Sequence, residues 1–280
     1  MPTKISETRI TGRHHPLLKR IRAMVRSGEL LGPGPAGQEI LLETPSLIEE
    51  ALRCGVPIHA VLYREGSTAA IQELGESLPP ETRRYWVQEE LFPELTSTET
   101  SPGIVALAQA PAWTEQDLFA GPRPFLAVLA GVQDPGNLGT ILRTAEALGA
   151  TGTLAARGTV SPYNAKAFRA AAGTLFRLPV LWNLTAQQIV AKLREHGITL
   201  LSSVPRGGRR IDELDLGGSV AVALGAEGSG LPRELEEAGC RVSIPMAGAV
   251  ESLNVAAAAA ILLYEIARQR QRSSAAWKGA

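Results

Sequence analysis

The sequence has 280 residues, of which 45% are hydrophobic and 20% are charged, a composition typical of globular proteins and a length that suits two domains. Lys and Arg number 28, as do Asp and Glu, so any polyanion must bind a local basic patch rather than the whole molecule. The cysteines, Cys54 and Cys240, lack metal-ligand spacing, which disfavours a disulfide scaffold or a zinc site and fits a reduced, cytoplasmic protein.

The chain shows no sign of a membrane segment. Its first residues lack the apolar core of a signal peptide, and the longest apolar run, 255–264, is about half the ~20 residues that a transmembrane helix requires. We therefore expect no membrane role.

Residues 1–110 are predicted to form a small α/β domain. Basic residues crowd the stretch from Arg9 to Arg26, which is the candidate contact for a polyanion; the alternative is a solvated amphipathic helix. We then predict strands at 39–43, 58–65, 85–87 and 103–110, and helices at 45–55, 67–78 and 88–95. Residues 111–123 mix Pro, Gly and polar residues without periodicity, as a linker does.

Residues 124–280 are predicted to form a second α/β domain. We expect strands at 125–132, 151–156, 178–183, 198–203, 219–224 and 242–246, helices at 137–149, 162–176, 186–197 and 232–240, and a long final helix from Val255. The strands are apolar throughout rather than alternating, which indicates a parallel sheet with helices on both faces. Such sheets bind ligands at the carboxyl ends of their strands, so the loops there form the candidate site.

Three loops that follow strands have unusual compositions. The first reads QDPGNLG and leads into a helix with Arg143; Asn137 either caps that helix or presents its amide, and the plain alternative is an ordinary turn. The second reads LGAEGSGL, in which Glu227 could receive a ribose hydroxyl or a backbone amide, or lie in a solvated turn. The third reads IPMAGAVESLN, where Ser252 or Asn254 could simply cap the last helix.

Three motifs occur in this order: DPGNxGxxxRxAxxxG, LGxEGxGL and IPMxGxVESLNVAxAAxxxxYE. Together they resemble the signature motifs of the SpoU (TrmH-like) RNA ribose 2'-O-methyltransferases of the SPOUT class. The resemblance continues through residues 161–169 and 175–180 and covers 121–272. The amino-terminal domain resembles the family's small L30e-like RNA-binding domain in pattern only. One departure is Ala256, where the family's third motif often has a second serine.

The resemblance implies an α/β fold whose carboxy-terminal parallel sheet is tied in a deep trefoil knot. The knot loops would hold S-adenosylmethionine through six residues: Leu224, Gly225, Ala226, Ile244, Met246 and Leu253. It also implies a homodimer in which Arg143 works beside the partner chain's cofactor, with Asn137, Glu227, Ser252 and Asn254 ordering the site. Because a guanidinium rarely gives up its proton in a protein, we expect Arg143 to stabilise the developing alkoxide rather than to act as the base.

The activity that the resemblance implies is 2'-O-methylation of a ribose in RNA. We expect 23S ribosomal RNA as the substrate because of the extra amino-terminal domain, with Arg13 and Arg169 as candidate RNA contacts. The alternatives are a transfer RNA 2'-O-methyltransferase and a catalytically inactive RNA-binding member of the same fold.

The remaining candidate residues carry structural expectations. His14 and His15 cannot share a helix face and no HExxH motif occurs, so we expect no metal site. Trp113, Trp182 and Trp277 are expected to be packing or linker residues.

Overall fold

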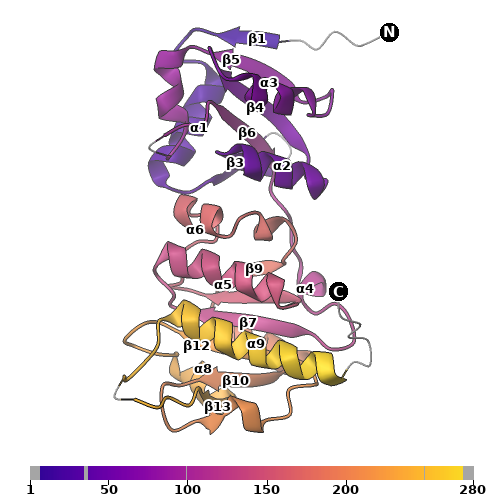
Figure 1. The fold of residues 1–280 in the computed structure, drawn as a ribbon, viewed down its shortest axis with the longest axis vertical. Coiled ribbons are helices and arrows are strands. Elements are labelled where there is room, and N and C mark those ends of the chain that lie inside the picture. Colours follow the sequence, from indigo (N-terminus) through magenta and orange to yellow (C-terminus); the bar gives the residue numbers. More distant parts are fainter. Residues whose placement is uncertain (1–6, 35–36, 99, 249, 274–280) are drawn as a thin grey trace. The chain divides into compact units, whose positions relative to one another are not determined.

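The computed structural model describes residues 7–34, 37–98, 100–248 and 250–273 (Figure 1), and thus leaves Trp277 outside the described part. Contacts between Cα atoms divide the chain into two compact units. The first comprises Met1–Ala112 together with Tyr163–Arg169, and the second comprises Trp113–Pro162 together with Ala170–Ala280. This division differs from the expected domains in the linker region and in the segment Tyr163–Arg169.

The first unit is built on a mixed six-stranded sheet in the order β1-β5-β4-β6-β3-β2. Its strands are β1 (Glu7–Ile10), β2 (Leu31–Gly34), β3 (Gly37–Leu42), β4 (Ile58–Arg64), β5 (Arg83–Val87) and β6 (Ile104–Gln109). Its helices are α1 (Pro16–Ser27), α2 (Pro45–Arg53), α3 (Ala69–Glu76) and the 3-10 helix η1 (Glu89–Leu95). Pairing is parallel from β1 to β4 and antiparallel from β4 to β2.

Two features of this unit differ from the prediction. Residues 88–95 were expected as an α-helix, but η1 contains Pro93, which lacks the amide donor that a helix interior needs. The edge strands β1 and β2 were not predicted, because β1 has only four residues and β2 contains two glycines and a proline.

The segment Tyr163–Arg169 packs as part of the first unit. The Leu30 amide donates to the Tyr163 carbonyl (2.8 Å), and the Ala165 amide donates to the Gly28 carbonyl (2.9 Å). The prediction of one helix over 162–176 is therefore wrong. The chain forms α6 (Ala165–Ala170) and a separate 3-10 turn, η2 (Thr174–Phe176), because Ala172 and Gly173 take positive φ values between them.

The second unit contains a seven-stranded, wholly parallel sheet in the order β11-β13-β10-β12-β7-β8-β9. Its strands are β7 (Phe125–Ala130), β8 (Gly152–Ala156), β9 (Val180–Leu184), β10 (Thr199–Ser203), β11 (Arg209–Arg210), β12 (Val220–Gly225) and β13 (Cys240–Ser243). Its helices are α4 (Glu115–Leu118), α5 (Pro135–Ala147), α7 (Ala186–Glu195), the 3-10 turn η3 (Ile211–Glu213), α8 (Arg233–Ala238) and α9 (Val255–Ser273). The predicted parallel sheet is confirmed, although the two-residue β11 was not foreseen.

Helices cover this sheet on both faces. Side chains of α4, α7 and α8, among them Leu118, Ile189 and Leu235, form one core with alternate residues of the central strands. Helices α5 and α9 run side by side over the sheet (Figure 1). Within the described residues, no helix combines the length and the apolar character needed to cross a bilayer.

The expected linker, 111–123, contains α4 and contributes to this core. Asp117 accepts hydrogen bonds from the amide and the hydroxyl of Thr114, a capping box that starts α4, and Leu118 is fully buried. The sequence of this segment shows no periodicity because α4 has only four residues.

Candidate active site

Three side chains from the three motif loops form a closed hydrogen-bonded cluster. Asn137 Nδ2 donates to Glu227 Oε1 (3.0 Å), and Asn254 Nδ2 donates to Asn137 Oδ1 (3.2 Å) and Glu227 Oε1 (3.1 Å). We call these residues the Asn137–Glu227–Asn254 cluster. They meet because β7 and β12 are neighbours in the sheet and α9 packs beside α5. Glu227 thus lies exposed in the turn after β12 and accepts two side-chain amides there.

Helix caps hold two members of this cluster in place. Asp134 Oδ1 accepts the Asn137 amide (2.8 Å), so Asp134 caps α5 and the side chain of Asn137 is left to reach Glu227. Asn254 does cap α9, because its Oδ1 accepts the amides of Ala256 (2.9 Å) and Ala257 (3.3 Å). Its Nδ2 group still serves the cluster, so the two interpretations of Asn254 hold together.

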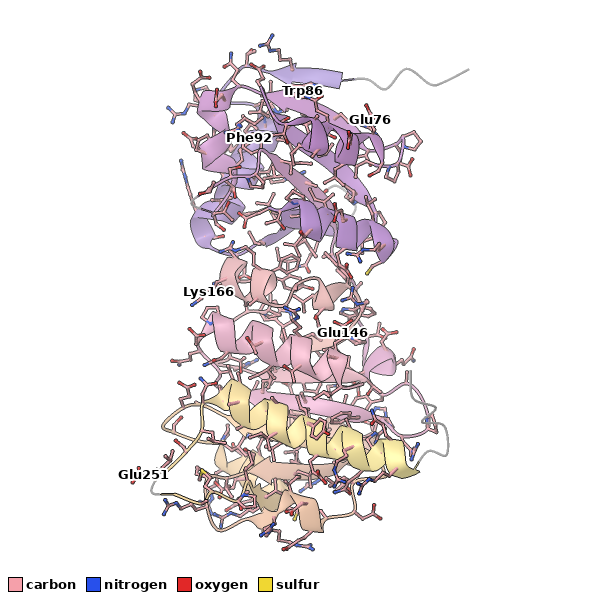
Figure 2. The ribbon with its side chains drawn as sticks, viewed as in Figure 1. Glu76, Trp86, Phe92, Glu146, Lys166 and Glu251 are labelled. Atoms are coloured by element: carbon pink, nitrogen blue, oxygen red, sulfur yellow. The ribbon has the colours of Figure 1, made fainter. Side chains whose placement is uncertain are left out.

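A cavity of about 570 Å³ opens beside the cluster. Its walls come from the second and third motif loops, from the residues after β10 and from the start of α9. All six residues expected to hold a cofactor line it: Leu224, Gly225, Ala226, Ile244, Met246 and Leu253. Glu227, Glu251 and Ser252 add polar groups to the lining, and Figure 2 shows Glu251 on the loop that precedes α9.

The second motif loop turns tightly at the cavity. Ala226 and Gly230 exchange two backbone hydrogen bonds (3.1 and 3.0 Å), and Gly228 and Gly230 take positive φ values of 99° and 70°. A Cβ atom on Gly225 would lie 2.3 Å from the carbonyl carbon of Gly230. Only glycine therefore allows the two ends of this loop to approach so closely.

Arg143 does not reach the cavity of its own chain. Its side chain is exposed on α5, on the face that also carries Thr140 and Ala147, and it has no hydrogen-bond or ion-pair partner among the described residues. The neighbouring helix α9 exposes Ile261 (43%) and Tyr264 (59%). An arginine without a partner thus lies on the same helix layer as two exposed hydrophobic side chains.

Both expected RNA contacts of the first unit are engaged in ion pairs. Arg13 Nη2 contacts Glu94 Oε1 (2.6 Å), and this hydrogen bond lowers the pKa of the Glu94 carboxyl below its usual value. Arg169 Nη1 contacts Oε2 of the fully buried Glu43 (2.8 Å) and the hydroxyl of Ser97 (2.6 Å). Arg169, expected in the second domain, is thereby fixed within the first unit.

Three acids of the same unit pair with four of the six cations in the stretch from Arg9 to Arg26. Arg9 pairs with Glu65, and Arg22 joins Arg13 on Glu94. The charge asymmetry in the sequence therefore reflects complementary partners in the fold, because the acids that follow are brought back against the basic helix.

Sequence reasoning missed several residues of the site. Asp134 was not identified as the cap of α5, although an Asp directly before Pro at the start of a helix is a known signal. Ser203, Val204 and Pro205 line the cavity from the end of β10, a loop without a recognisable motif. The rule that ligands collect at the carboxyl ends of parallel strands would have indicated them.

No group of three or more His, Cys, Asp or Glu side chains suited to a metal ion occurs in the part of the chain that the structure describes. His14 and His15 join no such group.

Comparison with known proteins identifies matches along most of the chain. The family model described as "SpoU rRNA Methylase family" matches residues 124–264, and "Thiostrepton-resistance methylase, N terminus" matches residues 7–121. An uncharacterized tRNA/rRNA methyltransferase of Synechocystis is 33% identical over 273 residues, 95% of either chain. The 23S rRNA (guanosine(2553)-2'-O)-methyltransferase RlmP of Bacillus subtilis is 33% identical over 227 residues, 81% of this chain and 87% of that protein.

Solved structures give the same result. The SpoU methyltransferase AviRb from Streptomyces viridochromogenes, in complex with AdoMet, superimposes with a TM-score of 0.78 at 27% identity, covering 93% of this chain and 99% of AviRb. A crystal structure of an RNA 2'-O ribose methyltransferase matches with a TM-score of 0.74 at 29% identity, covering 95% of this chain and all of that one.

Proposed function

The chain belongs to the SpoU rRNA methylase family, and we propose that it transfers the methyl group of S-adenosylmethionine to a ribose 2'-hydroxyl of 23S ribosomal RNA. The observation that carries the proposal is the convergence of the three motif loops on one cavity, beside the Asn137–Glu227–Asn254 cluster. Relatives named as ribosomal RNA 2'-O-methyltransferases support the substrate class.

The cavity fits S-adenosylmethionine. Its volume lies within the range of about 300–1,000 Å³ that small-molecule sites occupy, and Leu224, Ile244 and Leu253 give it apolar walls for an adenine ring. The close approach of Gly225 to Gly230 leaves backbone groups, rather than side chains, along one wall. When bound, S-adenosylmethionine supplies an electrophilic methyl group on its sulfonium.

The chain's own residues would position the ribose and stabilise charge. The cluster holds the loops after β7 and β12 and the start of α9 in one geometry, which keeps the 2'-oxygen in line with the methyl group. Arg143 would bind the adjacent phosphate and stabilise the negative charge that develops on the 2'-oxygen as the hydroxyl proton passes to that phosphate. Ser252, at the rim of the cavity, orders the loop or donates to that phosphate.

The position of Arg143 supports a composite site in a homodimer. Its guanidinium faces solvent rather than the cavity of its own chain, so a second subunit is needed to bring it to a cofactor. The exposed Ile261 and Tyr264 on α9 supply apolar surface for that contact. We propose that the α5 and α9 faces of two chains pack together and that each cavity receives Arg143 from the partner subunit.

The finer features of the fold are proposed on the same basis. The carboxy-terminal sheet would be tied in the trefoil knot that the resemblance implies, since the second and third motif loops line one cavity although β13 and β12 are separated by β10. The first unit would be the L30e-like domain that binds RNA, with phosphates competing for Arg13 and Arg169 against their carboxylate partners.

The test is a methyl-transfer assay with labelled S-adenosylmethionine and, as separate substrates, 23S ribosomal RNA and bulk transfer RNA. We expect label in ribosomal RNA, at a ribose 2'-oxygen identified by resistance to alkaline cleavage. Label only in transfer RNA would reassign the substrate, and cofactor binding without transfer to either RNA would indicate an inactive RNA-binding protein.

Arg143→Lys provides the internal control for chemistry. It should keep part of the RNA affinity, because the charge remains, but lose most of the turnover, because the planar guanidinium is gone. A near-normal rate would show that Arg143 is not central.

A further inference from the structure

Trp182 is an exposed aromatic side chain that neither the proposed cofactor site nor the proposed dimer face accounts for. Five large hydrophobic residues in the described ranges are exposed: Trp182, Val250, Leu253, Ile261 and Tyr264. Val250 and Leu253 belong to the third motif loop, and Ile261 and Tyr264 to the α9 face. Trp182, which the sequence suggested as a packing or linker residue, is 39% exposed on β9, at the edge of the sheet.

A local distortion of β9 exposes this side chain. Asn183 takes a positive φ of 62°, and the pairing of β8 with β9 shifts register there, which marks a β-bulge. As a result Leu181 and Leu184 both pack against the core, and both Trp182 and Asn183 are left exposed. Asn is among the residues that take the left-handed conformation most readily after glycine, so Asn183 allows the bulge to form at this position.

A cation lies at the same bulge. Arg157 directly follows β8, its amide donates to the Leu184 carbonyl (2.8 Å), and its Nε donates to the Asn183 carbonyl (3.4 Å). Its side chain is exposed and has no carboxylate partner among the described residues. Arg157 is therefore held by backbone while the rest of its guanidinium is free to bind an anion.

The surrounding sequence is depleted of acids. Residues 147–194 contain six cations and no Asp or Glu: Arg157, Lys166, Arg169, Arg177, Lys192 and Arg194. Three of them find carboxylates elsewhere in the chain, such as Glu146, which pairs with Arg177 and is labelled on α5 in Figure 2. Arg157 keeps its charge for an external partner.

The position of this pair relates it to the candidate active site. Strands β12, β7, β8 and β9 are consecutive and parallel, so Arg157 and Asn183 lie at the same edge of the sheet as the loops that carry Glu227 and Asn137. The cavity opens at the end of β12, three strands from β9, and neighbouring strands are about 4.8 Å apart, so roughly 14 Å separates the end of β9 from the cavity. Two or three nucleotides of an unpaired strand span that separation.

We infer that Trp182 and Arg157 form a subsite for an unpaired nucleotide two or three positions from the methylated one, with the base stacked on the indole and its phosphate on the guanidinium. This inference rests on the proposed function and adds residues that read the RNA outside the first unit. Stacking on an aromatic side chain and cationic contacts to the backbone are how proteins bind single-stranded RNA.

The first test measures binding without catalysis. A short oligoadenylate should quench part of the tryptophan fluorescence of the full-length protein, and Trp182→Phe should abolish that quenching. The control is Trp113→Phe, which should leave the quenching unchanged, because the Trp113 indole is engaged in a hydrogen bond to the Leu175 carbonyl. Trp182→Ala should raise the Kd of the oligonucleotide roughly tenfold, and Trp182→Phe, which keeps a stacking ring, should raise it less. Equal quenching by wild type and Trp182→Phe would overturn the inference.

The second test distinguishes the contribution of Arg157 from that of Trp182, and it distinguishes failure of the subsite from failure of the proposed function. Arg157→Gln should weaken oligonucleotide binding and reduce the slope of log Kd against log salt by about one, whereas Arg194→Gln, an exposed arginine on α7, should not. In the methylation assay both Trp182→Ala and Arg157→Gln should raise KM for RNA and leave the affinity for S-adenosylmethionine unchanged. If wild type methylates RNA and neither variant changes KM, the subsite is refuted and the proposed function stands. If wild type transfers no methyl group, the proposed function fails, and the fluorescence result decides the subsite by itself.

Discussion

Asn254 caps helix α9 and also belongs to the Asn137–Glu227–Asn254 cluster. Its Oδ1 accepts amides of the first turn of α9, while its Nδ2 donates to Asn137 and Glu227. Since the cap already fixes the side chain, the two donated hydrogen bonds cost little further conformational entropy. One residue therefore sets both the start of α9 and the geometry of the cluster.

Substitution of Asn254 should separate these roles. Asn254→Ser keeps a good capping group and should leave the thermal midpoint nearly unchanged, whereas Asn254→Ala should lose about 1 kcal/mol of stability. Both variants lose the donated hydrogen bonds, so we expect kcat to fall about tenfold or more in each. Calorimetry and the methylation assay provide the readouts. A fully active Asn254→Ser would show that the cluster does not position the reaction.

At the scale of elements, the second motif loop is shaped by backbone proximity. Gly225 ends β12, and the chain returns within five residues to pair Gly230 with Ala226. No side-chain interaction is needed to close this turn, but a side chain on Gly225 would prevent it. The cavity therefore depends on a glycine that itself presents no functional group.

Gly225→Ala should open this loop without unfolding the unit. The added Cβ would meet the backbone of Gly230 and Leu231, so we expect the affinity for S-adenosylmethionine to drop at least about tenfold, as measured by calorimetry. Gly218→Ala is the matched control, because its Cβ would meet no atom within 4 Å and its φ is not positive. Equal cofactor affinity in both variants would contradict the role of the turn.

In the whole molecule, Arg143 is exposed and does not line the cavity of its own chain. One site could therefore combine the cavity of one chain with Arg143 of another. Arg143 lies on α5, and the cavity opens between the second and third motif loops. If two chains pack through α5 and α9, every site takes its cavity from one chain and its guanidinium from the other. In such a dimer, two chains with different substitutions can together form one intact site, which is impossible when each site lies within a single chain.

Mixing two impaired variants should restore part of the activity. A dimer of one Arg143→Ala chain and one Asn254→Ala chain contains one cavity with an intact cluster facing an intact Arg143. After subunit exchange we therefore expect methyl transfer well above that of either variant alone. Absence of recovery, with mixed dimers verified by differently tagged chains, would place Arg143 and the cavity of one chain in the same site.

The dimer interface can be tested separately. Ile261→Glu places a charge in the exposed face of α9 and should shift the protein to a monomer in sedimentation velocity, whereas Ala191→Glu, on the exposed side of α7, should not. A wild-type monomer would refute the dimer.

The segment Tyr163–Arg169 offers a readout of how the first unit is completed. Burial raises the pKa of Tyr163 to about 12, from its ordinary value of 10. The phenol is neutral in both states below pH 10, so its contribution to stability is complete there. Between pH 10 and 12 the unfolded chain ionises first, and stability falls by up to about 2–3 kcal/mol.

Tyr163→Phe should reduce the loss of stability that occurs between pH 10 and 12. Chemical denaturation from pH 9 to about 12 would measure the free energy of unfolding of both proteins, and the wild type should lose more than the variant. Parallel curves would indicate that Tyr163 is not buried in the folded protein.

Composition and strand pattern were enough to predict the parallel sheet and to pick out three motif loops, six of whose residues line the cavity. Apolar strands such as 125–130 and 220–224 indicate that both faces of the sheet are buried. The glycine-rich loops that follow these strands indicate a site at the carboxyl ends of the strands, where the cavity lies. These inferences succeeded because they depend on local composition and on the regular geometry of parallel strands.

The partners of the charged side chains and the exposure of Trp182 could not be predicted from the sequence and became visible only in the fold. Arg13 and Arg169 looked like free cations until the fold brought Glu94 and the buried Glu43 against them. Trp182 looked like a packing residue until the bulge at Asn183 exposed it beside Arg157. Ion pairs and strand distortions involve residues that are far apart in the chain. Local sequence patterns do not predict such contacts, because the contacts depend on how the whole backbone folds.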